Sequence, residues 1–376
     1  MKYAVGIMSG TSLDGIDVAL VAISHEEQYT LIDFKSYPFS SFIKEKILLS
    51  LSKNTSNVEQ ICSLNFELGY LFGEAVLKIC SENDLNSQSL AFVASHGQTI
   101  YHHPTSTKGV VSSTLQIGES SVISELTKTT VVSDFRYRDM SVGGQGAPIV
   151  PFSEYKLYKN EQKNRILQNI GGISNATIIP KNATLTDVIA FDSGPGNMII
   201  DELCRHFYQK EYDKNGDYAS LGKINEELLH TFMSHPFIKQ PYPKTTGRED
   251  FGKQYVEQLL VQYPSIPSND WIATATLFTA KSIALAVQDL FNQNEDVELI
   301  VGGGGSYNKT LLSMLKQALP SYSILTQEDI GFSSDAKEAI AMVILGYQTL
   351  QRKPSNAPNA TGASKEVILG KITYYN

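Results

Sequence analysis

One short pattern occurs twice in this chain, once in each half, and it limits the fold more than any other feature. Each copy is an apolar run, a glycine-containing turn and a second apolar run rich in β-branched residues, which predicts strand, tight turn, strand. The segments are 3–7, 9–15 and 16–23 in the first copy, and 166–170, 171–172 and 174–179 in the second. The recurrence indicates an internal duplication and therefore two related α/β domains.

The regions between the two copies predict helices and further strands. After the first copy, apolar residues recur at steps of three and four from Val58 to Ile79, which predicts a long helix. Short apolar runs at 90–94 and 130–133 predict strands. They are followed by polar, glycine-containing segments at 95–104 and 134–148, which we interpret as loops that carry functional residues.

The second half continues the mixed α/β pattern. We expect a strand that ends at Asp192, helices from Met198 onward, a strand at 299–301 and a helix at 333–350. A chain of 376 residues with 42% hydrophobic composition is long enough for two domains. We place them at 1–160 and 161–376, because 161–164 is polar and charged, and the final helix could pack back on the first half. A cleft between two domains would be a natural ligand site.

Composition narrows the classes of partner and the compartment. A net charge of -8 and the lack of long basic runs argue against nucleic acid or an anionic membrane as a partner. No apolar stretch reaches the ~18 residues of a membrane helix, and the apolar run at the start is too short for a signal peptide. The three cysteines have no C-x-x-C spacing, which fits a reducing compartment. We therefore expect a cytoplasmic protein, and the sequence leaves a homodimer open.

The first glycine turn has the composition of a phosphate-binding hairpin. Gly10-Thr11-Ser12-Leu13-Asp14-Gly15 has the glycine spacing of a P-loop, but Ile16-Asp17 follows where a P-loop has Lys and Ser/Thr, so a P-loop NTPase is rejected. The glycines still allow close approach of the backbone to phosphate oxygens, and Asp14 is the candidate ligand for Mg²⁺. Alone, such a hairpin is more often only a turn.

A second copy of the hairpin makes a phosphate-binding role more probable than it is for a single turn. Asn169, Gly171 and Gly172 form the second copy, and two such hairpins facing each other across a cleft would hold the phosphates of one nucleotide from both sides. The glycine run Gly302, Gly303 and Gly304 follows an apolar strand and would provide a flat backbone surface for adenine or ribose. A dinucleotide-binding G-x-G-x-x-G motif fails here, because Tyr307 occupies its last position.

The best candidate for a general base is Asp192, which follows an apolar run and precedes the helix that begins near Met198. The competing interpretation is that Asp192 or Asn197 only caps that helix. In the first half, the two polar loops contain hydrogen-bonding and cationic residues that could bind a polar, anionic sugar. These residues are His96, Gln98, Arg136 and Arg138.

Across its whole length the chain resembles the anhydro-N-acetylmuramic acid kinases. The opening segment from Gly6 to Asp17 is similar to that family's signature at nearly every position. The resemblance continues, in order, through 95–99, 134–136, 143–148, 169–175, 191–197, 242–251, 302–305 and 361–363. Two departures, Ser193 and the pair Ser306-Tyr307, remove no hydroxyl or carboxylate that the chemistry needs.

The resemblance implies a two-domain fold of the sugar-kinase, actin and Hsp70 type, built from duplicated ribonuclease-H-like domains around a central cleft. It implies a cytoplasmic enzyme of cell-wall recycling that uses ATP and Mg²⁺ to convert 1,6-anhydro-N-acetylmuramic acid and water into N-acetylmuramic acid 6-phosphate. Asp192 would activate the water, Arg136 would be the first choice for a cation with Arg138 second, and Glu338 could bind sugar hydroxyls. Two alternatives remain: a kinase of a related free sugar, and a non-catalytic ATP-dependent module.

Overall fold

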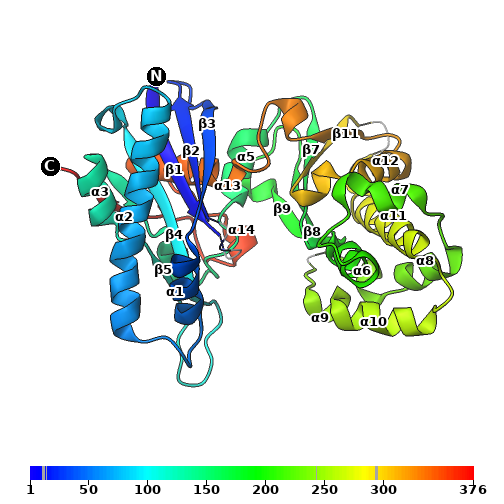
Figure 1. Ribbon diagram of the computed structural model, residues 1–376. Helices are drawn as coiled ribbons and strands as arrows, with labels where there is room; N and C mark the ends of the chain where they lie inside the picture. The colour runs from blue at the N-terminus through cyan, green and yellow to red at the C-terminus, as the bar shows by residue number, and fades with distance from the viewer. Residues whose placement is uncertain (11–12, 14, 243, 293–294) are drawn as a thin grey trace. The chain divides into compact units, whose positions relative to one another are not determined.

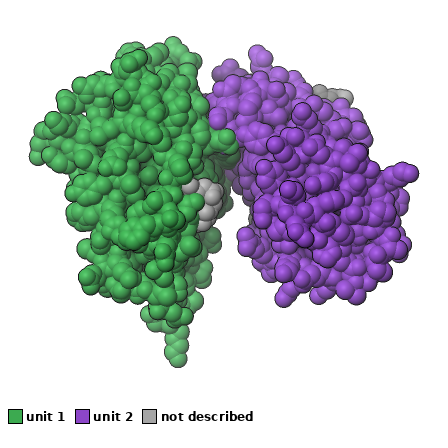
Figure 2. Space-filling view, in the orientation of Figure 1, with its two compact units in different colours: residues 1–157, 335–376 green, residues 158–334 purple. Residues whose placement is uncertain are grey.

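The chain forms two compact units, each built around one mixed β-sheet (Figures 1 and 2). This computed structural model describes residues 1–10, 13, 15–242, 244–292 and 295–376. The first unit comprises Met1–Leu157 and Asp335–Asn376, and the second comprises Tyr158–Ser334. We expected residues 161–376 to form the second domain, with the final helix able to pack back on the first half. The end of the chain lies instead with the first unit, because helix α13 (Lys337–Leu350) packs on the sheet of that unit.

The first unit contains a seven-stranded sheet with the order β12-β6-β4-β1-β2-β3, and β5 pairs with β4. Its strands are β1 (Lys2–Ser9), β2 (Gly15–Ile23), β3 (Tyr29–Pro38), β4 (Phe92–His103), β5 (Ser113–Ile117), β6 (Val131–Ser133) and β12 (Lys371–Thr373). Strands β1, β2 and β3 form an antiparallel meander, whereas β4 runs parallel to β1 and β6 runs parallel to β4.

The second unit repeats this arrangement with five strands in the order β11-β10-β7-β8-β9. They are β7 (Asn164–Ile170), β8 (Ile173–Ile179), β9 (Ile189–Pro195), β10 (Val297–Gly302) and β11 (Ser323–Thr326). Strands β7, β8 and β9 form the antiparallel meander, and β10 and β11 extend the sheet in parallel. The same topology in both units confirms the duplicated α/β fold expected from the repeated strand-turn-strand pattern.

In the first unit, helices pack on both faces of the sheet. They are α1 (Ser41–Leu51), α2 (Val58–Glu82), α3 (Ser120–Thr127), α4 (Phe135–Met140), α5 (Pro151–Tyr158), α13 and α14 (Pro358–Thr361). Alternation along β1 explains the two faces: Val5 and Ile7 belong to the core that α2 covers (Figure 1). Gly6 points the other way, where any Cβ would overlap the Ala339 carbonyl of α13. The side chain of Asn57 caps α2 at its start.

In the second unit, α11 connects the sheet to a helical layer. The helices are α6 (Met198–Tyr208), α7 (Asp217–Leu221), α8 (Glu226–Met233), α9 (Arg248–Phe251), α10 (Lys253–Gln262), α11 (Ser268–Val287) and α12 (Lys309–Ala318). One side of α11 contributes Ile283 and Val287 to the core over the sheet. Another side contributes Phe278 to a second core, which also contains Phe232 and Trp271. Because α11 is buried on several sides, its apolar residues are not confined to one face of the helix, so its sequence has no clear amphipathic pattern.

Several predicted boundaries differ from the structure, among them the helix expected from residue 333, which begins at Lys337. The segment 95–104 is mostly strand, because β5 pairs with it through contacts such as Gln98 with Ile117. The segment 134–148 contains the helix α4. Strand β9 continues past Asp192 to Pro195, because Gly194 and Pro195 still pair with β8. In the two strands, pairing with another strand extends the element. Within the described residues, no helix is long and apolar enough to span a membrane.

Candidate active site

The first hairpin lies between β1 and β2, and its described residues contact other residues of the first unit. Thr11, Ser12 and Asp14 lie outside the described residues, so the proposed Mg²⁺ ligand is among them. Leu13 is buried and has a φ of +59°, a left-handed conformation that is unfavourable for leucine. Such strain occurs at ligand-binding turns, where the surrounding structure compensates for it.

Gln98 fixes the start of the same hairpin. Its Oε1 accepts a hydrogen bond of 2.6 Å from Ser9 Oγ, and its Nε2 lies 3.4 Å from the Gly10 carbonyl oxygen. The side chain is fully buried. The role of Gln98 as a sugar ligand stays a prediction, and both ends of its amide contact other groups of the protein. Its observed contacts position the hairpin.

His96 is a buried, neutral histidine that orients Arg136. Arg136 Nε donates to His96 Nε2 over 2.9 Å, so Nδ1 carries the histidine proton and lies 2.7 Å from its acceptor, the Gly97 carbonyl oxygen. Burial, reinforced by the positive charge of Arg136, lowers the pKa of His96 to about 3. Arg136 Nη1 donates to the Gly146 carbonyl oxygen, which fixes the guanidinium at two points.

We expect His96 to make the protein less stable as the pH falls. The folded-state pKa of about 3 lies below the ordinary value of ~6.5, so only the unfolded state binds a proton between these values. The free energy of unfolding should therefore decrease by roughly 2 kcal/mol more between pH 7 and pH 5 in the parent than in a His96→Gln variant. Urea denaturation at both pH values measures this difference, and equal pH slopes would contradict the neutral-histidine assignment.

Asp139, which sequence reasoning did not single out, holds the glycine-rich loop beside Arg136. Its buried carboxylate accepts hydrogen bonds from Gly146 N at 2.9 Å, Asn356 Nδ2 at 3.0 Å and Thr361 Oγ1 at 2.8 Å. The loop that contacts Arg136 is thereby tied to the end of the chain. The only local signal was the position of Asp139 next to Arg138, whose own side chain is exposed.

Replacing Asp139 by asparagine should destabilise the first unit. The amide cannot accept all three hydrogen bonds, and its NH₂ group would face the existing donors. We expect the free energy of unfolding to fall by about 1–3 kcal/mol, the usual cost of an unsatisfied buried polar group. Urea denaturation measures the change, with Asp335→Asn at an exposed site as the matched control. Equal effects of the two substitutions would refute this role.

Glu338, at the start of α13, forms a charged group with Arg136 and Asp17. Although Glu338 is exposed, the surrounding protein displaces part of its hydration and raises its pKa, and the carboxylate of Asp17 adds to that effect. The cations Lys337 and Arg136 oppose the rise. Three of the residues we predicted, from β2, α4 and α13, are therefore close enough to influence one another electrostatically.

The second hairpin is Gly171-Gly172, between β7 and β8. Its two carbonyl groups accept the N–H groups of Gly196, Asn197 and Met198 at 2.7–3.1 Å, which fixes the turn against the start of α6. Neither glycine of the hairpin has a left-handed φ. A Cβ on Gly171 would have no neighbour closer than 3.5 Å, so the fold itself does not require glycine there.

The glycine run at the end of β10 lies beside this hairpin. Gly302 pairs with Asn169 across the parallel strands, and a Cβ on Gly303 would come within 2.7 Å of Asn169 Oδ1. Gly303 also has a φ of +76°, so glycine is required there by the fold. At Gly304 a Cβ would meet only Asn197 Nδ2, at 3.6 Å. The structure thus brings together every predicted nucleotide-binding residue of the second unit and adds Asn197.

Asp192 lies within β9, and its side chain does not cap α6. The N-cap of that helix is Asn197. Asp192 Oδ2 accepts hydrogen bonds from Thr245 Oγ1 at 2.8 Å and Thr246 N at 2.9 Å. No described residue donates to Oδ1. A β-bulge beside Asp192, where Asn175 pairs with Asp192 but Ser174 pairs with Gly194, sets the direction of the strand there.

The two threonines are site residues to which sequence reasoning gave no role. Thr246 also donates from Oγ1 to Asp250 Oδ2 over 2.6 Å, so the segment that orients Asp192 is itself held in place. The run Lys244-Thr245-Thr246-Gly247 was visible as part of the family-like segment 242–251. Its relation to Asp192 required the three-dimensional structure. A carboxylate with one oxygen held and one open has the geometry of a general base.

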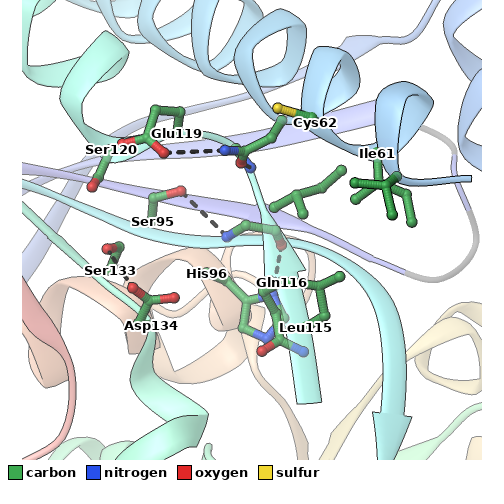
Figure 3. A pocket seen from close by; sticks show the side chains of 15 residues that line it. Ile61, Cys62, Ser95, His96, Leu115, Gln116, Glu119, Ser120, Ser133 and Asp134 are labelled. Carbon is green, nitrogen blue, oxygen red and sulfur yellow. Dashed lines mark hydrogen bonds between the residues drawn. The ribbon is translucent and has the colours of Figure 1, made fainter. Parts of the chain in front are cut away.

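A pocket of about 440 Å³ opens in the first unit, where the predicted sugar-binding loops meet α2 (Figure 3). Its lining comes from α2, β4, β5 and the start of α3, and it includes Ser95, His96 and Asp134. The pocket volume lies in the range of small-molecule sites. His96 therefore lines this pocket and also accepts a hydrogen bond from Arg136.

Comparison with known proteins agrees with these features. A family model described as anhydro-N-acetylmuramic acid kinase matches residues 2–375. Curated relatives named anhydro-N-acetylmuramic acid kinase include one from Bacillus cereus (strain AH187), 51% identical, and one from Clostridioides difficile (strain 630), 50% identical. The alignments cover 99% of this chain in both cases, and 99% and 98% of the two relatives.

Among solved structures, an activator of 2-hydroxyisocaproyl-CoA dehydratase from Clostridium difficile with bound ADPNP is similar, with a TM-score of 0.45 and 9% identity. The match covers 93% of this chain and 96% of that one. A TM-score below 0.5 tells nothing about function. The sequence matches are much stronger evidence of relationship, because they cover almost every residue at about 50% identity. This chain belongs to the anhydro-N-acetylmuramic acid kinase family.

Proposed function

We propose that this chain converts 1,6-anhydro-N-acetylmuramic acid, ATP and water into N-acetylmuramic acid 6-phosphate and ADP, in cell-wall recycling in the cytoplasm. The observation that carries the proposal is the placement of Asp192 in a chain that matches this kinase family over its whole length. One carboxylate oxygen is oriented by two threonines, and the other is open to a water molecule.

The bonds change in a balanced sequence. Asp192 accepts a proton from water as the water oxygen bonds to the anomeric carbon. The bond from that carbon to O6 breaks, O6 bonds to the γ-phosphorus, and the bond from that phosphorus to ADP breaks. Ring opening and phosphoryl transfer thus require the same carboxylate, and positioning supplies much of the catalysis.

The phosphates of ATP would lie against the Gly171-Gly172 hairpin. A Cβ at Gly171 would have no protein neighbour closer than 3.5 Å, which leaves room for phosphate beside the turn. The start of α6 lies beside the hairpin, and its helix dipole favours anions. Gly302 to Gly304, beside the same hairpin, would contact the adenosine. For the first unit we propose separately that the glycine hairpin from Gly10 to Gly15, with Ile16-Asp17, contacts phosphate oxygens.

Mg²⁺ fits the oxygen-rich chemistry of the first unit. Asp17 and Glu338 are carboxylates near each other, with the pKa of Glu338 raised by limited hydration and by Asp17, so a hard cation nearby would be favourable. Asp14 is the proposed direct ligand, and it lies outside the described residues. When bound, Mg²⁺ neutralises charge on the phosphates. Arg136, oriented by His96 and Gly146, would bind the anionic sugar.

The reaction is tested by incubating the protein with ATP and the anhydro sugar and following both ³¹P signals and the sugar's reducing end. We expect ADP and a sugar phosphate with an open ring to form in equal amounts. The comparison substrate is N-acetylmuramic acid, whose ring is already open. Phosphorylation of that sugar alone would identify a free-sugar kinase. ATP binding without turnover of either sugar would support a non-catalytic module.

A further inference from the structure

The pocket in the first unit has one buried polar atom without a partner. Gln116, on β5, is 8% exposed and lines the pocket beside Leu115 and His96 (Figure 3). Its Oε1 accepts no hydrogen bond from any described residue. Buried acceptors in proteins are almost always paired, so an unpaired one at a pocket wall indicates a missing donor.

The orientation of the Gln116 amide follows from its neighbours. Nε2 donates to Thr114 Oγ1 over 2.8 Å and to Thr99 Oγ1 over 3.2 Å. The Thr114 hydroxyl has two other neighbours that can take its proton, the Tyr101 carbonyl oxygen at 3.3 Å and His102 Nδ1 at 3.0 Å, which leaves it as an acceptor for Gln116 Nε2. The NH₂ group is thus committed to the threonines, and the free end of the amide is the acceptor oxygen.

The remaining walls restrict the ligand further. Val58, Ile61 and Leu115 give the pocket an apolar side that suits a methyl group. On another wall lies Glu119, where burial would raise the pKa but hydrogen bonds from Ser121 and Asn65 hold it below its ordinary value. Glu119 is therefore ionised and disfavours an anion in the pocket. A neutral group with one N–H donor and one methyl group matches all of these walls.

We propose that this pocket binds the acetamido group of the sugar, and that Gln116 recognises its amide N–H. The proposal rests on the proposed function for the identity of the sugar. The other large substituent of that sugar is a lactyl ether with a carboxylate, which Glu119 would repel. Because Gln116 Oε1 is shielded from solvent, binding would require the side chain to turn toward the pocket, and the acetyl methyl would then pack against the apolar wall.

The first test compares the natural sugar with its 2-acetoxy analogue, in which oxygen replaces the amide N–H. The parent enzyme should prefer the natural sugar in kcat/KM by about tenfold to a hundredfold, because the analogue leaves Oε1 unpaired. In Gln116→Met, which lacks the acceptor, the two sugars should become nearly equal. In Gln116→Glu, which keeps an acceptor, the preference should persist. Equal use of both sugars by the parent would overturn the proposal.

The second test measures binding without turnover. Cys62 lines the pocket and is exposed, whereas Cys80 and Cys204 are buried, so a maleimide should label Cys62 selectively. The anhydro sugar at ten times its Kd should slow labelling about tenfold. A Cys62→Ser variant controls for labelling elsewhere. Turnover without protection of Cys62 would place the sugar outside this pocket and leave the kinase reaction standing. Absence of turnover by the parent would overturn the proposed function itself.

Discussion

Asp192→Asn is expected to lower kcat by about 10²- to 10⁴-fold, the usual loss when a general base is removed. Phosphorylation and ring opening should fall together, because one carboxylate serves both. The fold should tolerate the change, since an amide oxygen can still accept from Thr245 Oγ1 and Thr246 N. ATP affinity should therefore stay close to that of the parent.

The measurement follows ADP release and the sugar's reducing end in the same reaction. Asp187→Asn is the matched control, because Asp187 is an exposed aspartate in the segment just before β9 and its carboxylate only caps a short turn. The control should keep near-parental turnover. A rate within a few-fold of the parent in Asp192→Asn would exclude the base. ADP release without ring opening would show that the two steps are not coupled.

Gly171→Val is expected to weaken ATP binding by at least about tenfold, or ~1.4 kcal/mol. A valine side chain would project from the turn into the space assigned to the phosphates. The fold should survive, because a Cβ at this position meets no protein atom closer than 3.5 Å. Gly171→Ala should show a smaller effect in the same direction. Isothermal titration with ATP gives the affinities.

A neighbouring glycine provides the contrast. At Gly196 a Cβ would overlap the Gly171 carbonyl oxygen, so Gly196→Val should lower the thermal stability of the protein as a whole. Gly171→Val should instead lose ATP affinity with little change in Tm. If Gly171→Val keeps full affinity and folds normally, the nucleotide does not use this hairpin. If both variants lose stability alike, glycine at 171 serves the fold.

The duplicated fold could be predicted from sequence because its signals are local. Alternating apolar residues, glycine turns and the helical spacing from Val58 to Ile79 depend only on neighbours along the chain, and all correspond to observed elements. The strand-turn-strand pattern around Gly171-Gly172 is equally local, whereas phosphate contact at the glycine hairpins stays a prediction. Boundaries failed where a distant partner extended an element, as β5 extends β4 through the pairing of Gln98 with Ile117.

The internal partners of the site residues could not be predicted, because they come from distant parts of the chain. Thr245 is 53 residues from Asp192, Arg136 is 40 residues from His96, and Thr361 is 222 residues from Asp139. Which of these pairs form depends on strand register and helix packing, which bring backbone segments together regardless of separation. The sequence by itself therefore determined the duplicated architecture and the candidate base. Only the tertiary structure decided that Asp192 is not a helix cap, that Gln98 positions the hairpin and that Gln116 has an unpaired acceptor, because hydrogen-bond geometry exists only after the sheets have assembled.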